Sequence, residues 1–147
     1  DYRIGYIRII KEERLKAVDG VKKMLLELKG ESIPFGIGTG GGRKSTELTL
    51  KKARIFEYFK VIVTADDVSQ GKPHPETFLL AAKKLGVNPH DCVVIGDAIN
   101  DVLGAKSAGM KMIAITDKSY IEDPELASPD LEVKKFSDIT VDMIKSI

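Results

Sequence analysis

Apolar segments of strand length alternate with amphipathic segments along this chain of 147 residues, and no other feature constrains its fold as strongly. The apolar segments are rich in β-branched residues, whereas the amphipathic segments repeat apolar residues at helical spacing. Strand and helix alternate in this way at least four times, which predicts an α/β fold with a parallel sheet and helices on both faces. The expected strands are 33–38, 61–64, 92–95, 112–115 and a short edge strand at 131–133, and the expected helices are 21–28, 45–56, 75–85, a helix following Asp97, and 139–147.

The composition limits the classes of protein to which the chain can belong. Hydrophobic residues make up 43%, charged residues 31%, and the net charge is +1, which fits one globular domain without an electrostatic bias toward nucleic acid. No apolar run approaches the ~20 residues that cross a membrane, and the sequence contains no secretory signal. The one cysteine, Cys92, excludes an intramolecular disulfide, and its place in an apolar strand indicates a buried structural thiol rather than a nucleophile. We therefore expect a cytoplasmic protein with neither a nucleic-acid nor a membrane partner.

Two aspartates follow the strand expected at 92–95, and they are the first candidates for chemistry. Gly96 ends the strand, Asp97 follows directly, and Asp101 comes one helical turn later, so both carboxylates can face one cavity. Ligands of open α/β sheets bind at this carboxyl edge, and Mg²⁺ prefers the oxygen ligands that two acids supply. The alternative is that Asp97 caps the following helix and Asp101 stabilises its first turn. The residues alone leave both interpretations open.

A glycine-rich loop follows the strand expected at 33–38. Its sequence is Thr39-Gly40-Gly41-Gly42-Arg43-Lys44-Ser45, and glycines between a strand and a helix can present backbone N–H groups to an anion. The loop is not a P-loop, because that motif requires glycine and lysine in succession before the serine, and here Arg43 separates them. We favour a phosphate-facing role, with the Thr39 hydroxyl as a donor to a phosphoryl oxygen, over a flexible connection.

A second loop, Gly71-Lys72-Pro73-His74-Pro75, is stiffened by two prolines that delay the start of the next helix. A surface lysine seldom needs so rigid a support, whereas a lysine that must meet anionic oxygens does. Lys72 is therefore a candidate ligand for phosphate. We assign no chemistry to His74 or His90, and we interpret Asp66-Asp67 as a solvated turn or a helix cap.

The strand that ends at Thr39, the loop Gly71–Glu76 and the segment Gly96–Asp101 together resemble the haloacid dehalogenase superfamily. The closest similarity is to its subgroup of sugar-phosphate phosphatases and β-phosphoglucomutase-like proteins. It extends from about residue 18 to residue 115. The resemblance implies a Rossmann-like parallel sheet as the core.

The resemblance also implies a role for each matched residue. Thr39, Lys72 and Asp97 would be catalytic, and the phosphoryl group would be bound by Thr39, Gly40 and Lys72. Gly40 departs from the family pattern, in which asparagine or serine usually follows the threonine. Asp97 and Asp101 would hold Mg²⁺, directly or through water.

One element of the family pattern is absent from the chain. The first strand of the family carries Asp-x-Asp, whose first aspartate attacks the phosphoryl group, and no strand of this sequence carries that pattern. We therefore expect the central nucleophile strand to lie upstream of Asp1. Residues 1–18 then resemble the end of a helical cap and its hinge, with one or two helical stretches, and 19–147 form a partial core. Because the absence of the central strand would leave two buried strand edges unpaired, we expect the chain to pair with that upstream segment.

The implied function is that of a hydrolase, a Mg²⁺-dependent phosphatase of a small phosphorylated metabolite that reacts through an aspartyl-phosphate. Two alternatives stay open. The chain could be a non-catalytic phosphate-binding, metal-binding or regulatory module, which fits the absent nucleophile, or the parent protein could be a phosphosugar mutase. The sequence predicts neither the identity of the substrate nor the oligomeric state.

Overall fold

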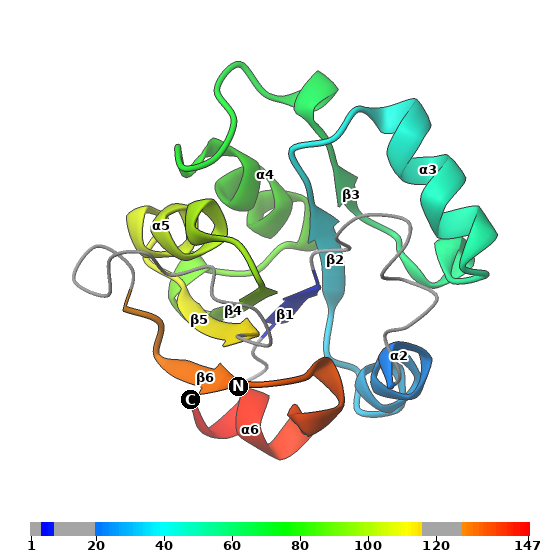
Figure 1. The fold of residues 1–147 in the computed structure, drawn as a ribbon, viewed down its shortest axis with the longest axis vertical. Coiled ribbons are helices and arrows are strands. Elements are labelled where there is room, and N and C mark those ends of the chain that lie inside the picture. Colours follow the sequence, from blue (N-terminus) through cyan, green and yellow to red (C-terminus); the bar gives the residue numbers. More distant parts are fainter. Residues whose placement is uncertain (1–3, 8–19, 116–127) are drawn as a thin grey trace.

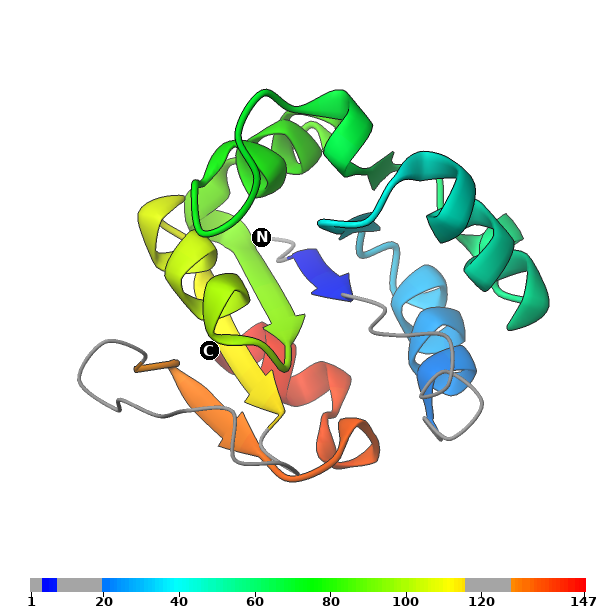
Figure 2. The same cartoon turned by 45° about the horizontal axis from the view of Figure 1, so that its top comes forward.

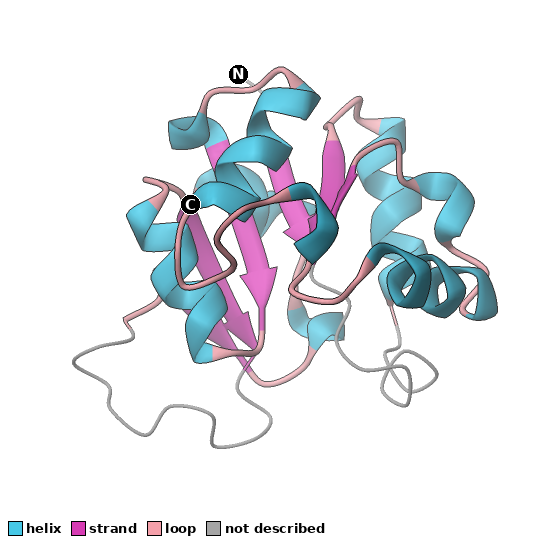
Figure 3. Cartoon of the chain, turned by 90° about the horizontal axis from the view of Figure 1, so that it is seen from above, coloured by secondary structure: helices cyan, strands magenta, loops and turns pink. Residues whose placement is uncertain are grey.

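A computed structural model of the chain describes residues 4–7, 20–115 and 128–147, with side chains for the last two ranges. Within these residues the strands form one parallel sheet in the order β3-β2-β1-β4-β5-β6 (Figure 1). Figure 3 shows the strands pointing in one direction with helices beside them. The strands are β1 (Ile4–Ile7), β2 (Phe35–Gly38), β3 (Ile62–Val63), β4 (Cys92–Gly96), β5 (Lys111–Ile115) and β6 (Leu131–Val133).

The helix ends follow from local sequence. Helix α4 begins after Pro75 and ends at Gly86, which adopts the left-handed conformation that glycine tolerates best. The helix predicted at 45–56 is wrong beyond residue 52, because Arg54 is left-handed and ends the helical path. None of the described helices is long and apolar enough to cross a membrane. The α-helices are α2 (Val21–Gly30), α3 (Arg43–Lys52), α4 (Glu76–Leu85), α5 (Ile99–Ser107) and α6 (Val141–Ser146), and the short 3₁₀ helices are η1 (Phe56–Tyr58), η2 (Ala65–Asp67), η3 (Pro89–Asp91) and η4 (Phe136–Asp138).

The sheet separates two apolar layers. Helices α2 and α6 contribute to the layer on one face, and α4 and α5 to the layer on the other (Figure 2). Alternate residues of β4 join opposite layers, with Val93 and Ile95 in the first and Cys92 and Val94 in the second. This alternation is what a strand buried on both faces requires. The predicted parallel sheet with helices on both faces is therefore confirmed, and Cys92 is buried as expected.

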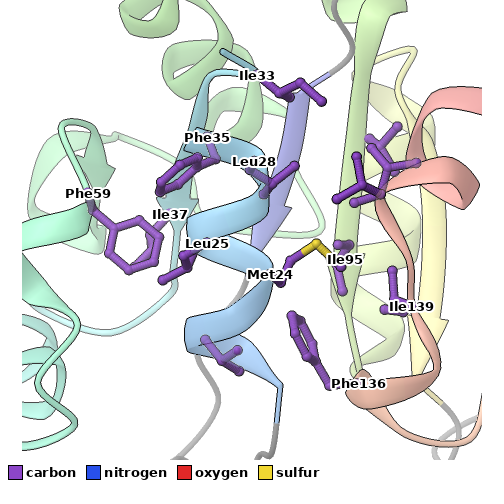
Figure 4. Close-up of a cluster of buried hydrophobic side chains, with 14 of the residues drawn as sticks. Met24, Leu25, Leu28, Ile33, Phe35, Ile37, Phe59, Ile95, Phe136 and Ile139 are labelled. Atoms are coloured by element: carbon purple, nitrogen blue, oxygen red, sulfur yellow. The ribbon is translucent and has the colours of Figure 1, made fainter. Parts of the chain in front are cut away.

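The first layer is built around one face of α2 (Figure 4). Val21, Met24, Leu25 and Leu28 are buried there, at the spacing of successive helical turns. They share one cluster with residues of β2, β4 and the C-terminal segment, among them Phe35, Ile37, Ile95, Phe136 and Ile139. The layer therefore ties the N-terminal half of the described chain to its last residues.

Strand β1 corrects two expectations about residues 1–18. Residues 4–7 are a strand rather than part of a helix, and they occupy the centre of the sheet. Ile4–Ile7 lies opposite Cys92–Ile95 on one side, and Gly5 and Tyr6 lie opposite Phe35 and Gly36 on the other. The edges of β2 and β4 are therefore not left unpaired, because the backbone of β1 supplies their partners. The predicted cap and hinge otherwise lie outside the described residues.

Leu25 and Leu26 offer a matched test of this packing, since they are neighbours on α2 with 0% and 50% exposure. We expect Leu25→Ala to lower the free energy of unfolding by about 2–5 kcal/mol, because it opens a cavity in the first layer. Leu26→Ala should change it by less than about 0.5 kcal/mol. Urea unfolding followed by circular dichroism measures both values, and equal losses for the two variants would contradict the assigned helix face.

Candidate active site

The carboxyl ends of β2 and β4 bring the predicted site residues to one edge of the sheet. These strands flank β1, and all three run parallel. Thr39 follows β2 and is buried, and its hydroxyl accepts a hydrogen bond from the Gly41 N–H at 3.1 Å. Asp97 follows β4, and Asp101 lies in the first turn of α5. Parallel strands present their carboxyl ends together, which is where such sheets bind ligands.

A buried ion pair joins Lys72 to Asp101. Lys72 Nζ lies 2.7 Å from Asp101 Oδ1, and the two side chains are 4% and 0% exposed. The same ammonium lies 3.5 Å from the carbonyl oxygen of Gly38 and 5.3 Å from the centre of the Phe78 ring. Lys72 therefore connects α5 to the end of β2, directly before Thr39. The structure thus brings together three of the predicted site residues, since Lys72 contacts Asp101 and the strand end that precedes Thr39.

Gly96 allows Asp101 to approach the end of β4. A Cβ placed on Gly96 would lie 2.7 Å from Asp101 Oδ2, closer than real Cβ atoms come, and 3.0 Å from Asp101 Cβ, which is a tight contact. The main-chain N–H of Asp101 also donates to the Ala98 carbonyl at 3.0 Å, so the residue is held by the first turn of α5. Glycine at position 96 is thus required by packing as well as by the strand end.

The donor set at this edge fits a hard cation such as Mg²⁺ through carboxylate oxygens. Asp97 is half-buried where β4 passes into α5, so it would be the better placed direct ligand of such a cation. Asp101 Oδ1 already accepts from Lys72, which favours contact with a cation through water. In the part of the chain that the structure describes, no group of three or more acidic, histidine or cysteine side chains gathers at one point.

Glu76 closes the loop that carries Lys72. Its carboxylate accepts the main-chain N–H groups of Ser69 at 2.9 Å and Gln70 at 3.0 Å. These two hydrogen bonds lower the pKa of Glu76 below its ordinary value, because they stabilise the charged form. His74 takes a structural part, since its Nδ1 accepts from the Glu76 N–H at 3.1 Å. The sequence analysis attributed the stiffness of the loop to its prolines and did not predict that Glu76 binds the loop backbone. An acid in the first turn of a helix could have indicated such a role.

The Asp66-Asp67 pair forms a cap, as one of the two expected interpretations stated. Thr64 caps the 3₁₀ helix η2 by accepting from the Asp66 N–H, and the Asp67 carboxylate accepts from the Thr64 N–H at 2.8 Å. Sequence reasoning missed the partner of Asp67, which is Arg43, with Nη2 at 2.7 Å from Asp67 Oδ2. No local pattern could have paired them, because they lie 24 residues apart.

Comparison with known proteins decides the family. The sequence pattern of the haloacid dehalogenase-like hydrolases matches residues 1–115. The chain belongs to this family. YhcW of Bacillus subtilis (strain 168) is 41% identical over 106 residues, which are 72% of this chain and 48% of YhcW. Pyrophosphatase PpaX of Bacillus cereus (strain AH820) is 33% identical over 132 residues, which are 87% of this chain and 60% of PpaX.

Solved structures of this family share the fold. The β-phosphoglucomutase of Clostridium difficile superposes with a TM-score of 0.75 at 26% identity, over 92% of this chain and 60% of that one. The chain thus spans about half to three fifths of the length of the relatives it matches. The site therefore belongs to a haloacid dehalogenase-like hydrolase fold whose neighbours include phosphatases and phosphomutases.

Removing one partner of the buried ion pair should destabilise this family member strongly. Lys72→Met leaves the Asp101 carboxylate without its cation, so we expect a loss of about 3 kcal/mol in the free energy of unfolding. Lys72→Met combined with Asp101→Leu should cost less than the two single changes added together, which a double-mutant cycle in urea measures. Lys83→Met, an exposed lysine on α4, is the matched control. Strictly additive losses would contradict the pair.

The lowered pKa of Glu76 predicts how the Lys72 loop responds to acid. A depressed pKa means that the carboxylate's contribution is present above its ordinary pKa and is lost as the pH falls through the folded value. The amide resonances of Ser69 and Gln70 should therefore titrate with a midpoint below the ordinary glutamate value of about 4.3. Glu76→Gln should abolish this titration and Glu57→Gln should leave it intact, as nuclear magnetic resonance can show. A midpoint at or above the ordinary value would contradict the two hydrogen bonds from Ser69 and Gln70 to the Glu76 carboxylate.

Proposed function

We propose that this chain is the greater part of the catalytic core of a Mg²⁺-dependent phosphatase that acts on a small phosphorylated metabolite. The observation that carries the proposal is the buried Lys72–Asp101 pair set against the end of β2. A charged lysine is costly to bury, and here the site keeps one beside the threonine that ends the strand. Such an arrangement supports electrostatic stabilisation of a phosphoryl group.

The phosphoryl group would be held by three groups of this chain. The Thr39 hydroxyl can donate to one oxygen, the Gly40 N–H to another, and the Lys72 ammonium can neutralise the charge. A Cβ added at Gly40 would meet nothing within 4 Å among the described residues. The open backbone at Gly40 therefore favours close approach by an anion.

The nucleophile would come from an aspartate upstream of Asp1. The central strand β1 has the sequence Ile-Gly-Tyr-Ile and carries no carboxylate. In the parent protein, a strand bearing the aspartate would take the central position that β1 holds. One carboxylate oxygen would attack phosphorus, the bond from phosphorus to the ester oxygen would break, and the leaving oxygen would take a proton from a general acid of the same segment. Water would then hydrolyse the acyl phosphate, releasing phosphate and restoring the carboxylate.

Asp97 would hold Mg²⁺ directly, with Asp101 acting through water. When bound, the ion supplies positive charge against the phosphoryl oxygens. Asp101 also keeps Lys72 in place, so its loss would affect both parts of the site.

Two other functions have specific support. A non-catalytic phosphate- or metal-binding module fits the central strand without a carboxylate. A phosphosugar mutase fits the likeness to the β-phosphoglucomutase structure. Phosphorus-31 nuclear magnetic resonance of reactions with phosphorylated sugars distinguishes the three functions. A phosphatase yields inorganic phosphate, a mutase yields a positional isomer of the substrate, and a binding module yields neither.

Lys72 provides the direct test in the parent protein. We expect Lys72→Arg, which keeps the charge but changes its geometry, and Lys72→Ala each to lower kcat, the latter by about 10²–10³. Circular dichroism must first show that the variants are folded at the assay temperature. Lys83→Ala should retain full turnover. Turnover like that of the unaltered protein in folded Lys72→Ala would refute the phosphatase assignment, and unchanged Mg²⁺ affinity in Asp97→Asn would remove the metal role of that residue.

A further inference from the structure

We propose that Arg43 is a positioning residue of the phosphoryl site, because its main chain and guanidinium, held by Asp66 and Asp67, fix the Thr39–Gly42 loop against the end of β3. The inference rests on the proposed function, in which this loop holds the phosphoryl group. It adds to the proposed site a residue whose described contacts are with Asp66, Asp67, Ile62 and Glu47 and not with Lys72 or Asp101.

The first contact places a carboxylate of the protein at the N-terminal end of α3. Arg43 is the first residue of α3, and Gly42 before it offers no side-chain cap. The main-chain N–H of Arg43 instead donates to Asp66 Oδ2 at 2.8 Å. A carboxylate of the protein thus occupies the end of α3, where an external anion would otherwise bind. The phosphoryl group would therefore bind at Thr39 and Gly40 instead of at the end of α3.

The second contact uses the guanidinium. Arg43 Nη2 donates to Asp67 Oδ2 at 2.7 Å and to the Ile62 carbonyl at 2.8 Å, so one side chain holds both a carboxylate and the backbone of β3. Arg43 Nη1 lies 3.5 Å from Glu47 Oε1. The positive charge of Arg43 is matched by acids of the protein, which makes it a support for the loop and not a ligand for phosphate.

Asp67, the acid that Arg43 contacts, is itself held in place by hydrogen bonds. Asp67 Oδ2 accepts from the N–H of Thr64 at 2.8 Å and from its hydroxyl at 3.0 Å, and Thr64 is fully buried. The Thr64 hydrogen bonds and Arg43 lower the pKa of Asp67, and Asp67 raises the pKa of Arg43. Both groups therefore stay charged across the physiological range.

Backbone hydrogen bonds complete the attachment of the loop. The Thr39 N–H donates to the Val63 carbonyl at 2.9 Å, and the Ala65 N–H donates to the Gly41 carbonyl at 2.9 Å. With Arg43 fixed at one end and Thr39 at the other, three successive glycines have little freedom left. Glycines lose more backbone entropy than other residues when they are ordered, so a loop built from them depends on such external attachments.

The experiment compares phosphate binding and amide exchange in residues 1–147. Calorimetry with inorganic phosphate measures affinity, and hydrogen exchange measures the amides of Gly40–Arg43. We expect Arg43→Ala to weaken phosphate binding about tenfold, equivalent to about 1.4 kcal/mol, and to speed exchange of these amides without any ligand. Arg43→Lys should restore only part of both. Lys44→Ala is the matched control, because it removes the same charge from the next residue, which is exposed.

The outcomes separate this inference from the proposed function. If folded Arg43→Ala binds phosphate as tightly as Lys44→Ala and its loop amides exchange equally slowly, Arg43 does not position the loop. If the unaltered chain binds no phosphate, the phosphate site fails, while faster exchange in Arg43→Ala would still establish the attachment. A loss of thermal stability with unchanged affinity and exchange would show a purely structural role and overturn the inference.

Discussion

The buried ion pair between Lys72 and Asp101 is the interaction on which the site depends. Burying either charge alone costs several kcal/mol, and only a close partner offsets that cost. The pair is made at 2.7 Å between a loop and a helix that are far apart in the chain, and the lysine also reaches the Gly38 carbonyl of β2. Three separate elements are thereby held at one edge of the sheet. The buried positive charge of Lys72 thus fixes the positions of its neighbours, and in the proposed function the same charge would meet the phosphoryl group.

A second constraint is that every buried strand edge needs a partner. Strand β1 meets this need for both β2 and β4, and so joins the two halves of the sheet. Backbone hydrogen bonds do not distinguish side chains, so four residues without a carboxylate can hold the central position as well as a catalytic strand could. Completion of the sheet and completion of the active site are therefore separate requirements in this haloacid dehalogenase-like hydrolase.

The acids near the site divide by what they bind. Glu76, Asp66 and Asp67 accept backbone N–H groups and hold loops in place. Asp101 balances the charge of Lys72, and Asp97 lies directly after the end of β4. Hydrogen bonds from N–H groups lower the pKa of Glu76 and of Asp67, so these two carboxylates stay charged at neutral pH. Acids that look alike in the sequence thus serve as support, counter-ion and prospective metal ligand.

Five of the six described strands, most of the helices and the placement of Thr39, Lys72 and Asp97 at strand ends or on a stiff loop were predictable from the sequence. These features follow from apolar periodicity and from the chemistry of glycine and proline, which act over a few residues. Tertiary structure decided the rest. It paired Lys72 with Asp101 across 29 residues and Arg43 with Asp67 across 24, and it placed residues 4–7 in the centre of the sheet instead of a helix. Charge pairs and strand edges find their partners through space, and nothing in the local sequence of either member specifies the other.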